Sequence, residues 1–457
     1  MPKLALIWEN MFNRKILNNL AKWKDSSQRK PLILRGARQV GKTSVVELFA
    51  KKNYTKFVQL NLEQVLQRNF YSQVASVDEF VRSVRVDKRI KITAGDTLIF
   101  IDEIQNCPNL LELLRFFYED YPDLHVIAAG SLLEKMIEQK KPSIPVGRVS
   151  YAYMYPLDFF EYLEAMGEQE LLLVLKQLSF GEGVSANIHQ LALDHFQKYM
   201  LVGGMPEIVA QYTQSTDLAQ INQVFSDIIT SYADDILKYA INSDAQYLDH
   251  VLLNAHTVAG QIYKYSNFAG TRSSNKEIGP AFRSLEQVML LTQVTATKSI
   301  RLPVVSQLYR PKKMVFLDVG LVNFQSCIQD YIFTKHKLAD IFKGRIVEQV
   351  VGQNLIAQGV NAKVKLNYWS PGKEISAAEV DFCFAHQGKI IGIEVKSGSA
   401  GKLRSLFVFA DKVVDHQLVR FHTGHLMKEE LIFDHKNYQL LSIPLYLVSR
   451  FFELLEK

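Results

Sequence analysis

The chain has 457 residues, too many for a single hydrophobic core, so we expect two to four domains. Hydrophobic residues make up 48% and charged residues 22%, which speaks against general disorder. Three scattered cysteines, Cys107, Cys327 and Cys383, speak against a disulfide framework or a zinc site. No stretch approaches the roughly 18 apolar residues of a membrane span, and we see no signal peptide. We therefore expect a soluble, cytoplasmic protein without a membrane partner.

The strongest motif is PLILRGARQVGKTSVVELFA, residues 31–50. An apolar strand leads into the pattern GxxxxGK[ST] and a helical stretch follows, which is the setting of a phosphate-binding loop. Glycines let backbone N–H groups surround a phosphate, and the helix N-terminus adds positive potential. We expect Lys42 to contact the β- and γ-phosphates and the Thr43 hydroxyl to bind Mg²⁺. The predicted nucleotide-binding residues are Gly36, Ala37, Arg38, Gln39, Val40, Gly41, Lys42, Thr43 and Ser44.

A second motif, TLIFIDEIQ at residues 97–105, places an acid pair after a buried strand. A carboxylate at the end of a strand beside a phosphate loop can hold Mg²⁺, and a second acid can polarise the attacking water. The pattern predicts Asp102 as a metal ligand and Glu103 as the general base. Alone, such a pair would more often be two surface acids, but the loop upstream favours the site.

Further strands are predicted at 56–63 and from residue 124, with a helix near 110–118. This alternation predicts a parallel sheet covered by helices on both faces. Ser131, after the last of these strands, is a candidate sensor of the γ-phosphate. Arg148 is a candidate to stabilise phosphate charge in its own subunit or in a neighbour, although a plain surface arginine is at least as consistent with the sequence.

Several stretches resemble one protein family. LRGARQVGKTS, IFIDEIQ, AAGSLLE and VGRVSYAYMYPLDFFEYL are similar to the AAA-type P-loop ATPase domain of a bacterial and archaeal family of ATP-binding proteins. The later GGMPEIV and FLDVGL resemble the second half of that family. The resemblance implies an ATPase domain at 1–165 with ATP and Mg²⁺ as cofactors. It is compatible with a homo-oligomeric ring and equally with a monomeric switch.

The middle region, 166–330, is predicted to be helical, with a break at Gly203-Gly204 and a restart at Pro206. Positive charge gathers in its second half. Between residues 260 and 316, nine basic residues and two acids give a net charge of +7, so the rest of the chain, at +6 overall, carries −1. The basic residues are Lys264, Arg272, Lys276, Arg283, Lys298, Arg301, Arg310, Lys312 and Lys313.

This basic segment coincides with a candidate winged helix at about 245–318, in which a helix capped near Ser274 precedes a two-stranded wing. The combination predicts contact with double-stranded DNA. A solvated basic face, or a winged fold that packs only on protein, is the alternative.

The last region, 335–457, contains EVDFCFAHQGKIIGIEVKSG, a predicted hairpin with its turn at Gln387-Gly388. Together with a preceding helix at 342–359, it resembles the PD-(D/E)xK nuclease fold, which implies that Asp381 and Glu394 bind Mg²⁺ and that Lys396 activates water. Glu348 on the helix is a further candidate acid. An inherited salt bridge in a fold retained for binding is the competing interpretation.

We thus expect an α/β chain with an N-terminal P-loop sheet, a helical and winged-helix middle, and a C-terminal domain like a restriction endonuclease. The leading hypothesis is a Mg²⁺-dependent ATPase coupled to DNA handling. The alternatives are a nucleotide-gated, metal-dependent nuclease and an ATP-controlled switch for protein partners.

Overall fold

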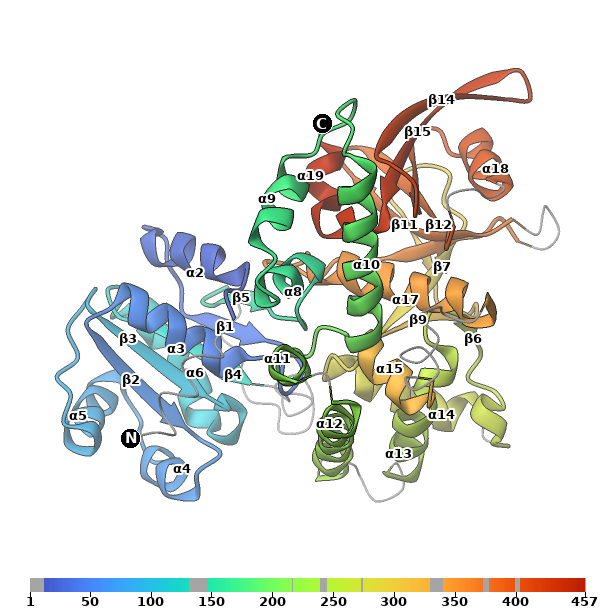
Figure 1. Ribbon diagram of the computed structural model, residues 1–457. Helices are drawn as coiled ribbons and strands as arrows, with labels where there is room; N and C mark the ends of the chain where they lie inside the picture. Colours follow the sequence, from blue (N-terminus) through green and yellow to red (C-terminus); the bar gives the residue numbers. More distant parts are fainter. Residues whose placement is uncertain are drawn as a thin grey trace. The chain divides into compact units, whose positions relative to one another are not determined.

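The structure is a computed structural model, shown in Figure 1. It describes residues 12–130, 147–215, 217–238, 245–272, 274–328, 340–372, 378–398 and 403–456. The chain forms two compact units. Unit 1 is Met1–Tyr155 with two short later segments, Gln287–Met289 and Gly359–Lys363, and unit 2 is the remainder. No helix in the described part of the chain is both long enough and apolar enough to span a membrane.

Unit 1 is built on a five-stranded, all-parallel sheet with the order β2-β3-β4-β1-β5. The strands are β1 (Leu32–Arg35), β2 (Lys56–Asn61), β3 (Thr97–Asp102), β4 (His125–Gly130) and β5 (Ser150–Tyr153). The helical segments are α2 (Ile16–Asp25), α3 (Lys42–Asn53), α4 (Val65–Tyr71), α5 (Val77–Lys88), η1 (Ile104–Asn106) and α6 (Pro108–Glu119). This confirms the predicted parallel sheet.

The central strands β3 and β4 are buried along their whole length, which explains why they are almost continuously apolar in sequence. Helix α3 packs against β2, β3 and β4, and α6 packs against α5. Phe80 of α5 meets Phe117 of α6 edge to face, with ring centroids 5.3 Å apart, inside the core that they share with the sheet. This packing fixes the carboxyl ends of β1 and β3, where the phosphate loop and the acid pair lie.

Unit 2 begins with helices and continues into a second sheet. Its helical segments are α8 (Phe159–Ala165), α9 (Gln169–Gln177), α10 (Ala186–Val202), α11 (Pro206–Gln214), α12 (Leu218–Lys238), α13 (Ala245–Asn254), η2 (Ala255–Val258), η3 (Phe268–Gly270), α14 (Asn275–Gln287), α15 (Val319–Gln325), α17 (Asp340–Ala357), α18 (Arg404–Lys412), η4 (Leu445–Arg450) and α19 (Phe451–Leu455). The predicted break after α10 and the restart at Pro206 are confirmed.

The second sheet is mixed and ten-stranded, in the order β14-β15-β13-β12-β11-β10-β7-β9-β6, with β8 paired to β7. Its strands are β6 (Ile262–Tyr263), β7 (Leu291–Thr297), β8 (Ser306–Gln307), β9 (Lys312–Phe316), β10 (Asn367–Trp369), β11 (Val380–His386), β12 (Lys389–Val395), β13 (His416–His422), β14 (Met427–Phe433) and β15 (Lys436–Pro444). Strand β7, in the predicted middle domain, pairs in parallel with β10 of the predicted last domain. The two regions therefore share one sheet, and the three-domain division stays a prediction.

The predicted hairpin is formed by β11 and β12. His386 pairs with Lys389, and the two residues between them, Gln387 and Gly388, have φ values of 45° and 78°. Positive φ at both central positions is typical of a tight type I′ turn. Two helices cover opposite faces of this hairpin, since Phe382 lies against α17 and its neighbour Cys383 lies in the cluster packed by α18.

Two sequence motifs of unit 2, GGMPE and FLDVG, meet at Asp318. Its buried carboxylate accepts hydrogen bonds from the N–H groups of Gly204 at 2.6 Å and Gly320 at 2.9 Å. A side chain at Gly203 would lie 2.0 Å from the Asp318 carboxylate, and one at Gly320 would lie 2.2 Å from the carbonyl oxygen of Val202. These glycines are required because two backbone segments approach each other closely around one acid.

Candidate functional site

The phosphate loop of unit 1 connects β1 to α3. Gln39 and Gly41 adopt positive φ values of 62° and 92°, so the backbone curls before the helix begins at Lys42. The Lys42 ammonium donates to the backbone oxygens of Gly36 at 3.0 Å and Ala37 at 2.8 Å. Burial lowers the pKa of Lys42, while the nearby charges of Glu103 and Asp102 oppose that effect. Lys42 is thus held inside the phosphate loop, where it is predicted to contact the phosphates.

Thr43 and Asp102 meet at the carboxyl ends of β1 and β3. The Thr43 hydroxyl donates to Asp102 Oδ2 at 2.7 Å, and the N–H of Glu103 donates to Asp102 Oδ1 at 3.1 Å. Burial raises the pKa of Asp102 to about 6; the charge of Glu103 adds to the rise and the Thr43 hydrogen bond opposes it. A hydroxyl and a carboxylate oxygen in contact are a donor set that suits Mg²⁺ beside a nucleotide. The residues present therefore fit the predicted cation.

Glu103 has a left-handed backbone, with φ 53° and ψ 45°. Non-glycine residues rarely adopt this conformation, and it is often found where a functional side chain is re-aimed. Its carboxylate accepts a hydrogen bond from the side-chain amide of Gln105, a buried residue. Gln105 therefore positions the predicted general base. Gln105 stands in the IDEIQ motif, but its residue type alone did not indicate a role in the site.

Two further contacts hold the phosphate loop in place. Arg14 is 6% exposed and donates to the carbonyl oxygens of Val40 at 3.1 Å and Tyr155 at 2.6 Å. Gly36 packs so closely on the residue that follows β5 that a Cβ there would lie 2.4 Å from the carbonyl oxygen of Met154. The sequence signalled Gly36 through the motif, but nothing local signalled Arg14, because its partners lie far away in the chain.

The two remaining predicted catalytic residues have different outcomes. Ser131 lies outside the described residues. Arg148 precedes the amino end of β5, and its Nε donates to Glu119 at 2.6 Å at the last turn of α6. The phosphate loop lies at the opposite, carboxyl edge of this parallel sheet. Arg148 thus lies away from the phosphate loop of its own chain, and its role in phosphate stabilisation, in its own subunit or in a neighbour, stays a prediction.

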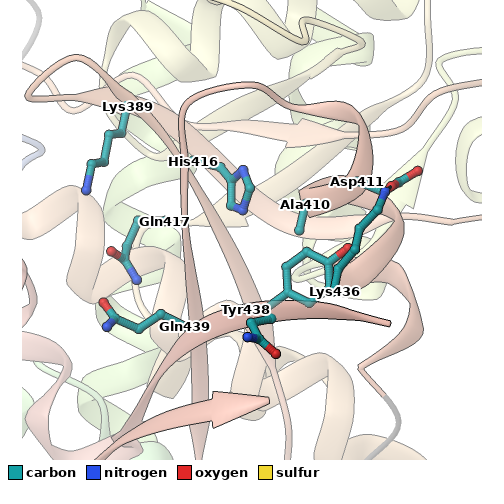
Figure 2. Close-up of a pocket in the computed structure, with 9 residues that line it drawn as sticks. Lys389, Ala410, Asp411, His416, Gln417, Lys436, Tyr438 and Gln439 are labelled. Atoms are coloured by element: carbon teal, nitrogen blue, oxygen red, sulfur yellow. Dashed lines mark hydrogen bonds and ion pairs between the residues drawn. The ribbon is translucent and has the colours of Figure 1, made fainter. Parts of the chain in front are cut away.

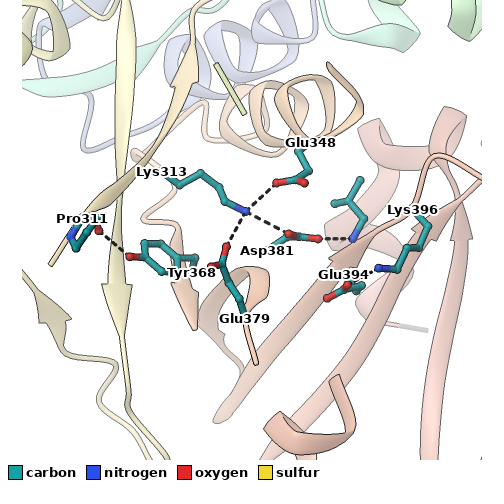
Figure 3. A network of polar contacts seen from close by, with 9 residues as sticks. Pro311, Lys313, Glu348, Tyr368, Glu379, Asp381, Glu394 and Lys396 are labelled. Carbon is teal, nitrogen blue, oxygen red and sulfur yellow. Dashed lines mark hydrogen bonds and ion pairs between the residues drawn. The ribbon is translucent and has the colours of Figure 1, made fainter. Parts of the chain in front are cut away.

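Unit 2 brings the predicted nuclease-like residues together around a lysine that was not among them (Figure 3). The ammonium of Lys313 on β9 lies 2.8 Å from Glu348 Oε2, 3.2 Å from Asp381 Oδ1 and 3.7 Å from Glu379 Oε1. Asp381 Oδ2 accepts the N–H of Val395 at 2.8 Å. We call Lys313, Glu348, Glu379, Asp381, Glu394 and Lys396 the carboxylate cluster.

The other ion pair of the carboxylate cluster joins Lys396 to Glu394 Oε1 at 2.5 Å. Burial raises the pKa of Glu394 to about 7 and that of Glu348 to about 8, and in both cases the charge of Asp381 adds to the rise. Within the described ranges, no group of three or more His, Cys, Asp or Glu side chains is arranged to hold a metal ion. No local signal in the sequence indicated Lys313, because it stands beside Lys312 directly before the apolar run MVFL, and nothing in that pattern separates the buried lysine from its neighbour.

The basic residues between 260 and 316 differ in their exposure. Lys313 is 2% exposed and bound by acids, so its inclusion among the DNA-contacting charges is wrong. Six of the basic residues are exposed and lie on α14 or in loops: Lys264, Arg272, Lys276, Arg283, Lys298 and Arg301. One of them, Lys264, lines a pocket of about 410 Å³. It is lined by Tyr263, Lys264, Tyr265, Ser266, Asn275, Leu308, Tyr309, Arg310, Pro311 and Lys312.

Another pocket, of about 320 Å³, lies over β12, β13 and β15 (Figure 2). It is lined by Lys389, Ala410, Asp411, His416, Gln417, Lys436, Asn437, Tyr438 and Gln439. An ion pair between Lys436 and Asp411 closes one side. None of these lining residues belongs to a predicted site.

Comparison with protein families agrees with the geometry of unit 1. Residues 28–163 match a family described as an AAA domain. These residues form an AAA-type P-loop ATPase domain. Residues 193–330 and 343–446 match two families described as domains of unknown function, DUF8612 and DUF4143. In the comparison with curated proteins, no relative matches the chain.

The comparison with solved structures gives matches at low identity and low TM-score. The Walker-type ATPase PABY2304 of Pyrococcus abyssi is 15% identical, with a TM-score of 0.43, over 70% of this chain and 97% of that chain. The ORC2 protein of Aeropyrum pernix is 10% identical, with a TM-score of 0.30, over 70% and 92%. The RuvB Holliday junction branch migration motor of Thermotoga maritima is 13% identical, with a TM-score of 0.29, over 65% and 93%.

Proposed function

We propose that the chain binds and hydrolyses ATP in a Mg²⁺-dependent reaction at the carboxyl ends of β1 and β3. The observation that carries this proposal is the convergence of Lys42, Thr43 and Asp102 there, within a curled loop at a helix N-terminus. Anion binding needs backbone N–H groups and a cation, and phosphoryl transfer needs a hydroxyl and a carboxylate to hold the metal.

Each residue has a distinct role in this proposal. The ammonium of Lys42 exchanges its two carbonyl partners for phosphate oxygens, which are stronger acceptors because they are charged. Thr43 and Asp102 hold Mg²⁺, which neutralises charge on the phosphates when it is bound. Glu103, oriented by Gln105, accepts a proton from the attacking water.

The variant Glu103→Gln tests these roles because it keeps the shape of the site and removes the base. We expect it to bind a fluorescent ATP analogue as tightly as the wild type. Its rate of ATP hydrolysis should be at least about 100-fold lower than that of the wild type. Glu112→Gln, on the exposed side of α6, is the matched control. Wild-type turnover in Glu103→Gln would refute the assignment of the base, and loss of nucleotide binding would place Glu103 in binding instead.

We further propose that the exposed basic residues of unit 2 contact nucleic acid. Helix α14 presents Lys276 and Arg283, seven residues apart and hence on one helical face, and its N-terminus is capped by Ser274 and Glu277. The adjoining pocket adds a highly exposed aromatic ring, Tyr309. Basic side chains beside aromatic rings suit a phosphate backbone with bases to stack on.

The test is duplex and single-stranded DNA binding, followed by fluorescence anisotropy at two or more salt concentrations, with ATP hydrolysis measured in parallel. Replacing Lys276 and Arg283 with alanine should weaken binding and lower the salt slope by about 2. Lys428→Ala, an exposed lysine on β14, should leave both unchanged. If wild-type affinity does not depend on salt, the basic segment is a solvated face, and an ATP-controlled switch for protein partners becomes the better account.

Two finer proposals complete this picture. In a homo-oligomer, Arg148 would stabilise phosphate charge on a neighbouring subunit's nucleotide. Mixing wild-type subunits with Arg148→Ala subunits tests this, because ATP hydrolysis should be partly lost.

We place the protein in the cytoplasm, in keeping with free thiols at Cys107, Cys327 and Cys383. Fractionation of cells would contradict this placement if the protein sedimented with membranes.

A further inference from the structure

The carboxylate cluster contains its own cation. Lys313 is 2% exposed, and its ammonium faces three carboxylate oxygens, one each from Glu348, Asp381 and Glu379. The ammonium donates hydrogen bonds to Glu348 and Asp381, and Glu379 at 3.7 Å completes an ion-pair shell of three carboxylates around it. The side chain reaches them from β9 past the ring of Phe382, whose centroid is 5.3 Å from the nitrogen.

We propose that the Lys313 ammonium is the resident cation of the carboxylate cluster, and that the cluster takes up a divalent metal ion only when this lysine is replaced. Figure 3 shows the Lys313 side chain pointing between Glu348 and Asp381, where an ion bridging those acids would have to lie. A dication placed there would be repelled by the ammonium, and the two would compete for the same oxygens. The lysine therefore joins β9, α17 and β11 by ion pairs and keeps the cluster free of metal.

A second observation shows that ligand capacity remains. Glu394 is 7% exposed, its Oε1 is paired with Lys396, and its Oε2 has no hydrogen-bond partner among the described residues. An unpaired, buried carboxylate oxygen next to Asp381 is costly unless something satisfies it. With Lys313 gone, Glu348, Asp381 and Glu394 would offer hard oxygen ligands of the kind that Mg²⁺ and Mn²⁺ prefer.

This inference is independent of ATP hydrolysis, so its failure would leave the proposed ATPase untouched. It bears directly on the nuclease hypothesis, because a lysine-filled cluster supplies no metal-bound water. The C-terminal region is then a rigid scaffold that holds its nuclease-like residues in an inactive, ion-paired form.

The experiment uses the full chain without nucleotide and Mn²⁺ as the probe, with free Mn²⁺ measured by electron paramagnetic resonance. Binding at the cluster is defined as the part that Asp381→Asn abolishes. We expect the wild type to show none of this binding. Lys313→Met should gain one such site, which the added Asp381→Asn change removes, and Mn²⁺ should raise the Tm of Lys313→Met. Lys312→Met, which alters the preceding residue of β9, should behave as the wild type.

Two results would overturn the inference: wild-type Mn²⁺ binding that Asp381→Asn removes, or a folded Lys313→Met that gains none. If Lys313→Met does not fold, Lys313→Gln keeps a hydrogen-bonding side chain without the charge, and the same gain is expected. The first of these results would overturn the inference even if no variant at Lys313 folded, because it compares only the wild type with Asp381→Asn.

Discussion

Replacing Asp318 with alanine tests how unit 2 is held together. The change leaves the N–H groups of Gly204 and Gly320 buried without their acceptor. Each buried donor that loses its partner costs about 1–3 kcal/mol, which gives about 2–6 kcal/mol for two. Ionised Asp318 is itself costly to bury, so we expect a net loss of about 2–4 kcal/mol at pH 7.

The same residue gives a pH dependence. Burial raises the pKa of Asp318 from 3.8 to about 6, opposed by its backbone hydrogen bonds. The folded state therefore holds this proton more tightly than the unfolded state, so its contribution to stability is complete below pH 4 and falls as pH rises from about 4 to 6. The change over that window is on the order of 3 kcal/mol. Asp318→Asn has no proton to lose and should lack this part of the slope.

Amide hydrogen exchange of peptides covering α10, α11 and α15 measures the effect within unit 2, where a single unfolding midpoint for a chain of several units would not. A loss of 2–4 kcal/mol corresponds to exchange about 30- to 1,000-fold faster. Asp227→Ala, an exposed acid on α12 bonded to Gln223, is the control and should cost under about 0.5 kcal/mol. Equal protection in wild type and Asp318→Ala would refute the reasoning.

The remaining predictions concern unit 1. Thr43→Val should lower Mg²⁺-dependent ATP hydrolysis about 100-fold, whereas Thr43→Ser keeps the hydroxyl and should stay within about tenfold of the wild type in the same steady-state assay. Gln105→Ala frees Glu103 and should lower kcat about tenfold with little change in KM; an altered KM alone would contradict this positioning role. Gly36→Ala forces its Cβ against Met154 and should weaken binding of a fluorescent ATP analogue without unfolding β1, as judged by circular dichroism.

Sequence was most informative where function depends on a local pattern. The phosphate loop could be predicted because strand, glycines, lysine and hydroxyl are neighbours in the chain, and the same holds for Asp102-Glu103 and for the turn at Gln387-Gly388. Residues that act over a distance could not be found in this way. Arg14 reaches the loop from another element, and its sequence neighbours carry no trace of that contact.

The carboxylate cluster shows most clearly what the sequence alone could not predict. The acids of the hairpin and their lysine were recognised by strand spacing, and the structure places them together. Lys313 was counted among surface charges because composition does not reveal which way a strand residue points. Only the pairing of β9 with β7 and the packing of α17 bring it inside. Arg148 illustrates the same point, since its proximity in sequence to the ATPase motifs does not indicate the edge of the sheet on which it lies.

The central claim is that unit 1 hydrolyses ATP through Lys42, and the most direct measurement is phosphate release by the purified full chain with ATP and Mg²⁺. Lys42→Ala removes the cation inside the phosphate loop, and Lys52→Ala removes an exposed lysine later in α3. We expect turnover by the wild type and by Lys52→Ala, and none above background with Lys42→Ala or with Mg²⁺ chelated. Hydrolysis by Lys42→Ala at the wild-type rate would contradict the claim.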